Sequence, residues 1–154
     1  MKGKVILAAL VICLAAASAA LADDAFSGTW KLNEAKSKLS PGMNKNTTVS
    51  YEVSGDSVKV TLDGVGGDGK ATHDEWTGKY DGKDYPVTGN PMTDTRAYKK
   101  VNDHTLEATG KKDGKVVLTA KITVSADGKT RTVVATQTGA DGKKSTSTAV
   151  YEKQ

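Results

Sequence analysis

Tight-turn signals recur at short intervals along this sequence and leave room only for short strands between them. Asp-Gly pairs, with one reversed Gly-Asp pair, stand at 55–56, 63–64, 68–69, 81–82, 113–114, 127–128 and 141–142. Such pairs are among the strongest local signals for a β-hairpin turn. The segments between them are rich in Val, Thr, Tyr and Ile, which favour strands. Ten strands are therefore predicted, over 26–33, 46–54, 57–63, 70–80, 83–88, 94–101, 104–111, 115–125, 129–138 and 143–152.

A single short helix is predicted after the first strand. Asn33 is a suitable N-cap for a turn or two of helix over 33–39, and Pro41-Gly42 ends it. With ten short strands and at most this one helix, the sequence predicts an all-β fold.

Turn geometry predicts how the strands pair, because a slip of one residue would turn an apolar face outward. A two-residue turn at 55–56 places three apolar pairs on one face: Val53 with Val58, Tyr51 with Val60, and Val49 with Leu62. Glu52 and Lys59 then meet on the other face, where an ion pair is expected. A turn at 81–82 places Trp76 opposite Val87, the Tyr85 ring over Gly78, and Lys79 opposite Asp84 as a second ion pair.

A three-residue loop over 112–114 is preferred for the next long hairpin, because a two-residue turn would pair apolar with charged positions. Gly114 then takes the left-handed position. The resulting pairs are Leu106 with Ala120, Ala108 with Leu118, and Gly110 with Val116. The register between 94–101 and 104–111 stays open, and with it the direction of Arg96 and Tyr98.

Sequential pairing brings the last strand back to the first, and closing the sheet removes two exposed edges. The prediction is a single up-and-down antiparallel β-barrel. Its inferred inner faces carry unusually small or polar residues: Val116, Leu118, Ala120, Ile122, Val124, Val133, Ala135, Ser145, Ser147 and Ala149. Such side chains do not fill a barrel of this size, so an internal cavity is expected. A cavity of roughly a few hundred cubic ångströms would favour ligand binding, and a filled interior would favour a role for the loops.

The first 22 residues have the composition of a secretory signal peptide. Lysines at positions 2 and 4 precede an apolar run over 5–17, and an A-x-A pattern ends at Ala22. The run is shorter than the roughly 20 residues of a membrane-spanning helix. We therefore expect cleavage after Ala22, a secreted or periplasmic protein, one mature domain over 23–154 and no remaining membrane span. Because Cys13 is the only cysteine, the mature domain has no disulfide.

Two short motifs carry a resemblance to a known superfamily. FSGTWKL, residues 26–32, contains the Gly-x-Trp pattern as Gly28 and Trp30, and the chain ends STSTAVYEKQ. These motifs resemble the first and last strands of the calycins, which include lipocalins and fatty-acid-binding proteins, and look most like small secreted bacterial lipocalin-like proteins without an assigned activity. The resemblance implies a barrel that binds a small hydrophobic molecule. It also implies that Gly28, Trp30 and Lys153 close one barrel end, with a basic residue of the last strand covering the tryptophan.

The chain departs from the fatty-acid-binding proteins in two ways. The segment between Leu32 and Thr47 leaves no room for their helical lid. Their carboxylate-binding Arg-x-Tyr aligns with residues 149–151, where Ala149 replaces the arginine and only Tyr151 carries over. Fatty-acid binding by that route is therefore not expected.

A substitute for the missing arginine is available on the neighbouring predicted strand. A three-residue loop over 140–142 would place Arg131 directly opposite Tyr151, and a guanidinium and a phenol together suit a carboxylate. The alternative is structural: Arg131 or Lys153 lays its aliphatic stem across Trp30. Further cavity candidates are Tyr51, Trp76, Tyr85, Arg96 and Tyr98. For Trp76 and Tyr85 the alternative, and the more frequent outcome, is that such aromatic side chains fill one end of the barrel.

Patterns typical of other functions are incomplete. The stretch GVGGDGKA, residues 64–71, nearly matches a phosphate-binding loop, but it lacks the final hydroxyl residue and precedes a strand. His73 and His104 lack the spacing of metal ligands. No Ser-His-carboxylate arrangement indicates catalysis, and basic residues do not gather with aromatic ones. We therefore expect no enzyme activity, no metal or other cofactor and no nucleic-acid partner.

These observations predict reversible, non-enzymatic binding of a small hydrophobic or amphipathic molecule inside a monomeric barrel. The alternative is an envelope protein-interaction or inhibitor module that acts through the barrel loops and holds no small molecule. The first function requires an accessible cavity, and the second does not.

Overall fold

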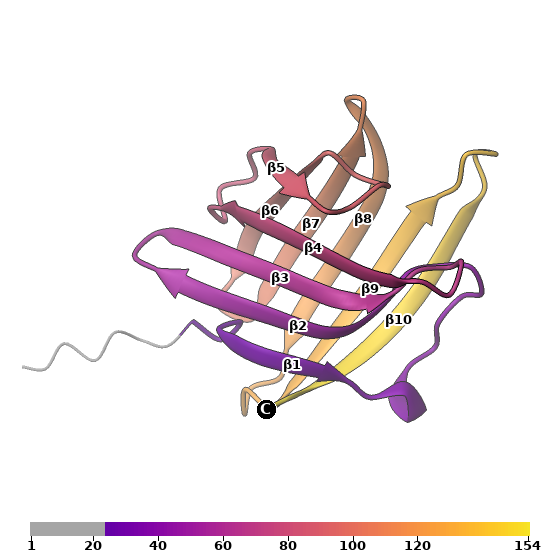
Figure 1. The fold of residues 1–154 in the computed structure, drawn as a ribbon. Helices are drawn as coiled ribbons and strands as arrows, with labels where there is room; N and C mark the ends of the chain where they lie inside the picture. Colours follow the sequence, from indigo (N-terminus) through magenta and orange to yellow (C-terminus); the bar gives the residue numbers. More distant parts are fainter. Residues whose placement is uncertain (1–23) are drawn as a thin grey trace, which may run out of the picture.

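Ten antiparallel strands form a closed barrel, in which neighbours in sequence pair with one another and β1 also pairs with β10 (Figure 1). The structure is a computed structural model and describes residues 24–154. The strands are β1 (Gly28–Leu32), β2 (Lys45–Ser54), β3 (Ser57–Val65), β4 (Ala71–Gly78), β5 (Tyr85–Thr88), β6 (Thr95–Asn102), β7 (Thr105–Lys112), β8 (Lys115–Val124), β9 (Thr130–Thr138) and β10 (Lys144–Lys153). The predicted all-β barrel is confirmed. The signal peptide predicted over 1–22 lies outside the described residues.

One turn of 3-10 helix, η1 (Glu34–Lys36), follows β1. Its N-cap is Asn33, whose Oδ1 accepts a hydrogen bond from the Lys36 N–H at 3.2 Å. The chain then runs beside β10, where Lys38 and Thr148 exchange backbone hydrogen bonds. The helix predicted over 33–39 is thus shortened to a single turn. In the part of the chain from residue 24 onward, no helix has the length and apolar character needed to cross a bilayer.

The β2/β3 hairpin has the register predicted from its Gly55-Asp56 turn. Its apolar pairs are Val53 with Val58, Tyr51 with Val60, and Val49 with Leu62. Glu52 is opposite Lys59, but the ion pair expected between them is wrong: Lys59 Nζ lies 2.9 Å from Glu75 Oε1 on β4. A long lysine side chain reaches diagonal neighbours on the next strand as easily as the residue opposite.

The β4/β5 pairing places Trp76 opposite Val87, as predicted. Tyr85 also covers Gly78, because a Cβ atom on that glycine would lie 2.6 Å from the tyrosine ring. The predicted ion pair between Lys79 and Asp84 is wrong. Lys79 bonds Asp56 in the neighbouring turn, and Asp84 bonds Lys111 on β7, since both lie beyond the paired part of β4 and β5.

The β7/β8 hairpin corrects the predicted three-residue loop. Asp113 and Gly114 both have positive φ, 49° and 75°, and form a two-residue turn with Gly114 in the expected left-handed position. β8 has one extra residue opposite the step from Gly110 to Lys111, and this β-bulge keeps the apolar side chains of both strands facing inward despite the two-residue turn. The pairs are therefore Leu106 with Ile122, Ala108 with Ala120, and Gly110 with Leu118. Val116, expected inside, is 51% exposed.

The two ends of the barrel differ. At the closed end, which carries residues 24–27 and the turns at 55–56, 79–84, 103–104 and 125–129, aromatic side chains fill the interior. Tyr98 makes edge contacts with Trp76, Tyr51 and Tyr80, with ring centroids 4.7, 6.4 and 6.3 Å away. Phe26 contacts Tyr80 at 6.1 Å. We call these five residues the aromatic cluster.

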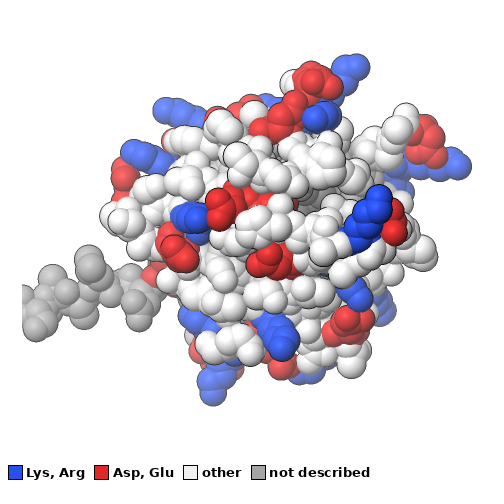
Figure 2. All heavy atoms as spheres, viewed as in Figure 1, with Lys and Arg blue, Asp and Glu red and all other residues white. Residues whose placement is uncertain are grey.

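The open end carries the loops 33–44, 66–70, 89–94, 113–114 and 139–143. In Figure 1 the hairpins β7/β8 and β9/β10 extend at this end, behind the crossing strands β1–β4. Figure 2 is viewed from the same side as Figure 1 and shows acidic and basic side chains interspersed over this side of the barrel, with uncharged areas between them. The unfilled part of the barrel interior lies near this open end.

Candidate ligand-binding site

An internal cavity of about 130 Å³ lies between the aromatic cluster and the open end. Much of its wall is apolar, from Val49, Leu62, Ala108, Ile122, Val133 and Ala135. Its mouth is bordered by Met43, Asn44, Asn90, Met92 and Gln137, which lie in or beside the open-end loops. The small inner residues of β8 and β9 thus leave a cavity, as the sequence predicted. It is smaller than the few hundred cubic ångströms expected, because the aromatic cluster fills the closed half.

Arg131, on β9, is opposite Tyr151 on β10. This register is the one predicted from a loop over 140–142, which the Gly139 N–H closes by donating to the Lys143 carbonyl at 2.8 Å. The guanidinium carbon lies 4.8 Å from the Tyr151 ring centroid and 5.3 Å from that of Tyr51. Arg131 therefore lies between two aromatic rings, in the wall of the cavity.

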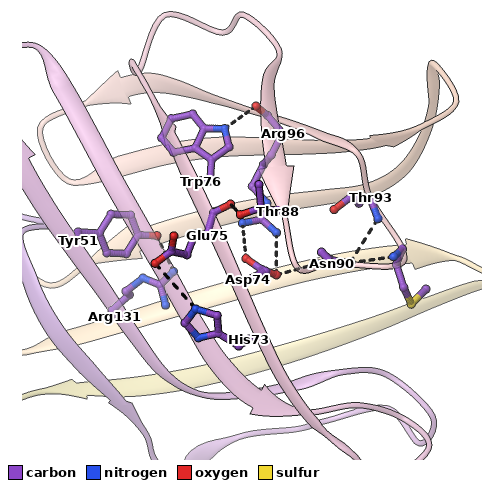
Figure 3. A network of polar contacts seen from close by, with 11 residues as sticks. Tyr51, His73, Asp74, Glu75, Trp76, Thr88, Asn90, Thr93, Arg96 and Arg131 are labelled. Atoms are coloured by element: carbon purple, nitrogen blue, oxygen red, sulfur yellow. Dashed lines mark hydrogen bonds and ion pairs between the residues drawn. The ribbon is translucent and has the colours of Figure 1, made fainter.

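The hydrogen bonds of Arg131 are incomplete. Its Nη2 donates to the Tyr51 hydroxyl at 2.8 Å (Figure 3), but its buried Nε and Nη1 have no acceptor within the described residues. The Tyr151 hydroxyl donates instead to the Asn46 carbonyl at 3.0 Å. Two donors of a buried guanidinium are thus left without partners, which is unfavourable unless something else binds there.

The charge of Arg131 is also unbalanced. Across residues 24–154, no carboxylate forms an ion pair with it. Burial raises the pKa of Tyr98 and of Tyr151, so both phenols are neutral at physiological pH. Burial opposes the charge on Arg131, yet the adjacent Tyr51 and Tyr151 hold its pKa above the ordinary value. The site therefore holds a permanent positive charge that no described residue compensates.

Arg96 lies in the same wall with its charge paired. Its Nη1 and Nη2 donate to the two carboxylate oxygens of Asp74, each at 3.2 Å, and Asn90 Nδ2 donates to Asp74 Oδ2 at 2.7 Å (Figure 3). The Trp76 indole donates to the Arg96 carbonyl at 2.8 Å. The direction that the sequence left open is settled: Arg96 and Tyr98 face inward, opposite Gly110 and Ala108.

The other predicted site residues are placed as follows. Arg131, Tyr151, Arg96 and Tyr98 line the cavity, whereas Tyr51 reaches it only through Arg131. Trp76 lies in the aromatic cluster. Tyr85 lies near the barrel surface, where its hydroxyl donates to Asp81 at 2.9 Å. Neither Trp76 nor Tyr85 contacts the cavity, because both belong to the half of the barrel that aromatic rings fill.

Sequence reasoning did not find several polar residues of the cavity wall, among them Asp74 and Asn90. Asp74 had a usable signal, because it stands two residues before Trp76 and so shares its inward face on β4. Asn90 had none, since it lies in a loop whose path no periodicity describes.

Gly28, Trp30 and Lys153 lie together where β1 meets β10. Lys153 Nζ is 5.3 Å from the centroid of the buried Trp30 ring, and Trp30 pairs with Lys153 across the closure. Gly28 has a φ of 106°, and a Cβ atom there would lie 3.0 Å from Lys153 Cε. Lys153 thus covers Trp30, while the Arg131 guanidinium lies over tyrosine rings. Of the two side chains considered as covers for Trp30, Arg131 and Lys153, it is Lys153 that lies over the ring.

No family model and no curated protein matches this sequence. Among solved structures, the chain is similar to a redesigned β-barrel, mFAP1, bound to DFHBI, with 15% identity, a TM-score of 0.48, and coverage of 84% of this chain and 95% of that chain. It is also similar to apocrustacyanin C1, with 14% identity, a TM-score of 0.45, and coverage of 85% and 62%. Lobster apocrustacyanin A1 is similar at 14% identity and a TM-score of 0.44, with coverage of 86% and 63%.

Proposed function

We propose that this protein binds a small hydrophobic or amphipathic molecule reversibly inside its barrel, without catalysis. The observation that carries the proposal is the apolar cavity with an unpaired, buried guanidinium in its wall. The cavity opens between the loops, so that inner residues such as Leu62, Val133 and Ala135 stay partly accessible to solvent. Covering this apolar surface would supply the driving force for binding.

Arg131 orients the ligand in this proposal, and the Tyr151 ring packs against the guanidinium, since the Tyr151 hydroxyl already donates to the Asn46 carbonyl. A guanidinium attracts an oxyanion by its charge and by charge-assisted hydrogen bonds, and Arg131 has neither a counterion nor a partner for Nε and Nη1 within the described residues. The calycin-like motifs at 26–32 and 145–154 support the same kind of function. The protein acts as a secreted or periplasmic monomer, once residues 1–22 are removed.

The test is an NMR titration of the mature protein with a panel of small amphipathic molecules, after native mass spectrometry of protein purified from its own host. We expect a retained small molecule, and amide shifts at cavity-lining residues. Ala135→Leu, which fills the cavity from β9, should abolish the shifts. The matched control, Val134→Leu, changes a neighbour that is 43% exposed on the outer face, and should leave them intact.

No retained molecule and no panel binding would overturn the proposal. Equal binding by Ala135→Leu and Val134→Leu would place the ligand outside the barrel, and would support the alternative function through the loops.

A further inference from the structure

The dimensions and charge of the cavity carry an inference about the ligand itself, which rests on the proposed function. We infer that the barrel selects compact organic monoanions, in which one carboxylate is attached to an apolar ring or short branched chain, over long-chain fatty acids. Three features of the wall lead to this ligand class: the volume, the fixed floor and the single unpaired charge.

The volume matches a small ring. An engineered apolar cavity of about 150 Å³ in another protein binds benzene, and the cavity here is about 130 Å³. A second cavity of about 70 Å³ lies beside it under residues 39–46, and Met43 borders both. Even together these spaces are below the roughly 300 Å³ at which drug-sized ligand pockets begin. An extended acyl chain therefore has no room.

The floor of the cavity is fixed. Tyr98 lines it and is buried against Trp76, Tyr51 and Tyr80 in T-shaped, edge-to-face contacts. Moving this ring to admit a longer chain would disrupt the whole aromatic cluster. Close-packed interiors of this kind do not open by small, independent side-chain shifts.

The charge of the wall selects a monoanion. Asp74 is already neutralised by two hydrogen bonds from Arg96, so the cavity has one net positive charge, on Arg131. A single carboxylate balances that charge. A neutral ligand leaves the charge unbalanced, a cation is repelled, and a dianion brings one charge too many into a site that is mostly apolar.

The body of the ligand would lie against the small residues of β8 and β9. Leu118, Ala120, Val133 and Ala135 continue the wall from Arg131 toward the open end. These side chains present methyl and methylene groups, without a charged group among them. A ligand with its carboxylate at Arg131 thus places its apolar part in the apolar half of the cavity.

The test compares benzoate with benzamide, its neutral isostere, with phthalate, a dianion, and with palmitate, by isothermal titration calorimetry at pH 7. We expect benzoate to bind at least tenfold more tightly than benzamide or phthalate, and palmitate not to compete. Arg131→Met should remove the preference for benzoate over benzamide. The control Lys121→Met, which removes an exposed positive charge from the outer face of β8, should keep it.

The outcomes separate this inference from the proposed function. Equal affinity of wild-type protein for benzoate and benzamide, or tighter binding of palmitate, would overturn the ligand class and leave the proposed function standing. If none of the four probes binds, while host-purified protein retains another molecule, the ligand class is again wrong. If nothing binds and nothing is retained, both are wrong. The comparison of benzoate with benzamide on wild-type protein tests the ligand class even if Arg131→Met does not fold.

Discussion

Arg96 and Arg131 line one cavity and are buried to nearly the same degree, with 4% and 3% of their surfaces exposed, yet among the described residues only Arg96 has a counterion. Arg96 makes two hydrogen bonds to Asp74, which in turn accepts one from Asn90. Arg131 makes one within residues 24–154, to the Tyr51 hydroxyl, and packs between two rings. The first arrangement is complete within the fold. The second leaves a charge and two donor atoms without a partner among the described residues.

Removing the paired arginine should have the largest effect on stability. Arg96→Met leaves the Asp74 carboxylate buried without its partner, and such a change typically lowers the free energy of unfolding by about 3–5 kcal/mol. Urea denaturation at pH 7 measures it. The double variant Arg96→Met/Asp74→Leu replaces the pair by apolar groups and should recover most of the loss. A single variant as stable as wild type would show that the ion pair contributes nothing.

Removing the hydrogen bond between Tyr51 and Arg131 should have the second-largest effect on stability. Tyr51→Phe keeps the ring beside the guanidinium and removes the one hydrogen-bond acceptor that residues 24–154 offer to it, which should lower the free energy of unfolding by about 1.5–3 kcal/mol. The control is Tyr85→Phe, whose hydroxyl bonds Asp81 near the surface and should matter less. In an Arg131→Met background the effect of Tyr51→Phe should nearly disappear, as a double-mutant cycle would reveal. If Tyr51→Phe and Arg131→Met had additive effects on the free energy of unfolding, the contact between the two side chains would be contradicted.

Removing the unpaired arginine should change stability in the opposite direction. Arg131→Met takes a lone charge out of the interior and leaves no carboxylate behind, so the ligand-free protein should gain about 1–2 kcal/mol. The same urea denaturation measures it. A loss of several kcal/mol would mean that the contacts with the Tyr51 and Tyr151 rings outweigh the desolvation of the charge. Arg131 would then be a structural plug, and the contrast with Arg96 would vanish.

The fold was predictable because each strand is bounded by a turn with its own chemistry. Six to ten residues between Asp-Gly pairs, with one apolar face, allow one register at 55–56 and at 140–142, and both were correct. The bulge after Gly110 was not predictable, since one extra residue in β8 leaves no signature in the pattern of apolar residues. The predicted ion pairs of Lys59 and Lys79 were wrong for another reason. A long, flexible lysine side chain reaches several carboxylates, so the residue directly opposite is not always its partner.

The site was predictable only where a register could be derived. The pairing of Arg131 with Tyr151 follows from loop length. The pairing of Arg96 with Asp74 joins β6 to β4 across the short strand β5, whose register with β6 covers two residue pairs, so turn geometry gives no route to it. Trp76 was a cavity candidate because it faces inward, with the filling of a barrel end as the alternative, and it lies in the aromatic cluster. Facing inward does not distinguish the filled half of a barrel from the open half.

The smallest expected effect concerns the tyrosines that surround the two arginines. Burial raises the pKa of Tyr98 and of Tyr151, whereas in the unfolded chain a tyrosine ionises near pH 10. The folded state therefore holds these protons more tightly. Their contribution to stability is fully present below about pH 10 and is lost as the pH rises through the folded values. A spectrophotometric titration of tyrosinate should show Tyr98 and Tyr151 ionising only on unfolding, with Tyr151→Phe identifying one of the two signals. If either phenol ionised near pH 10 in the folded protein, burial would not be holding its proton, and only above that pH would a tyrosinate balance the charge of Arg131.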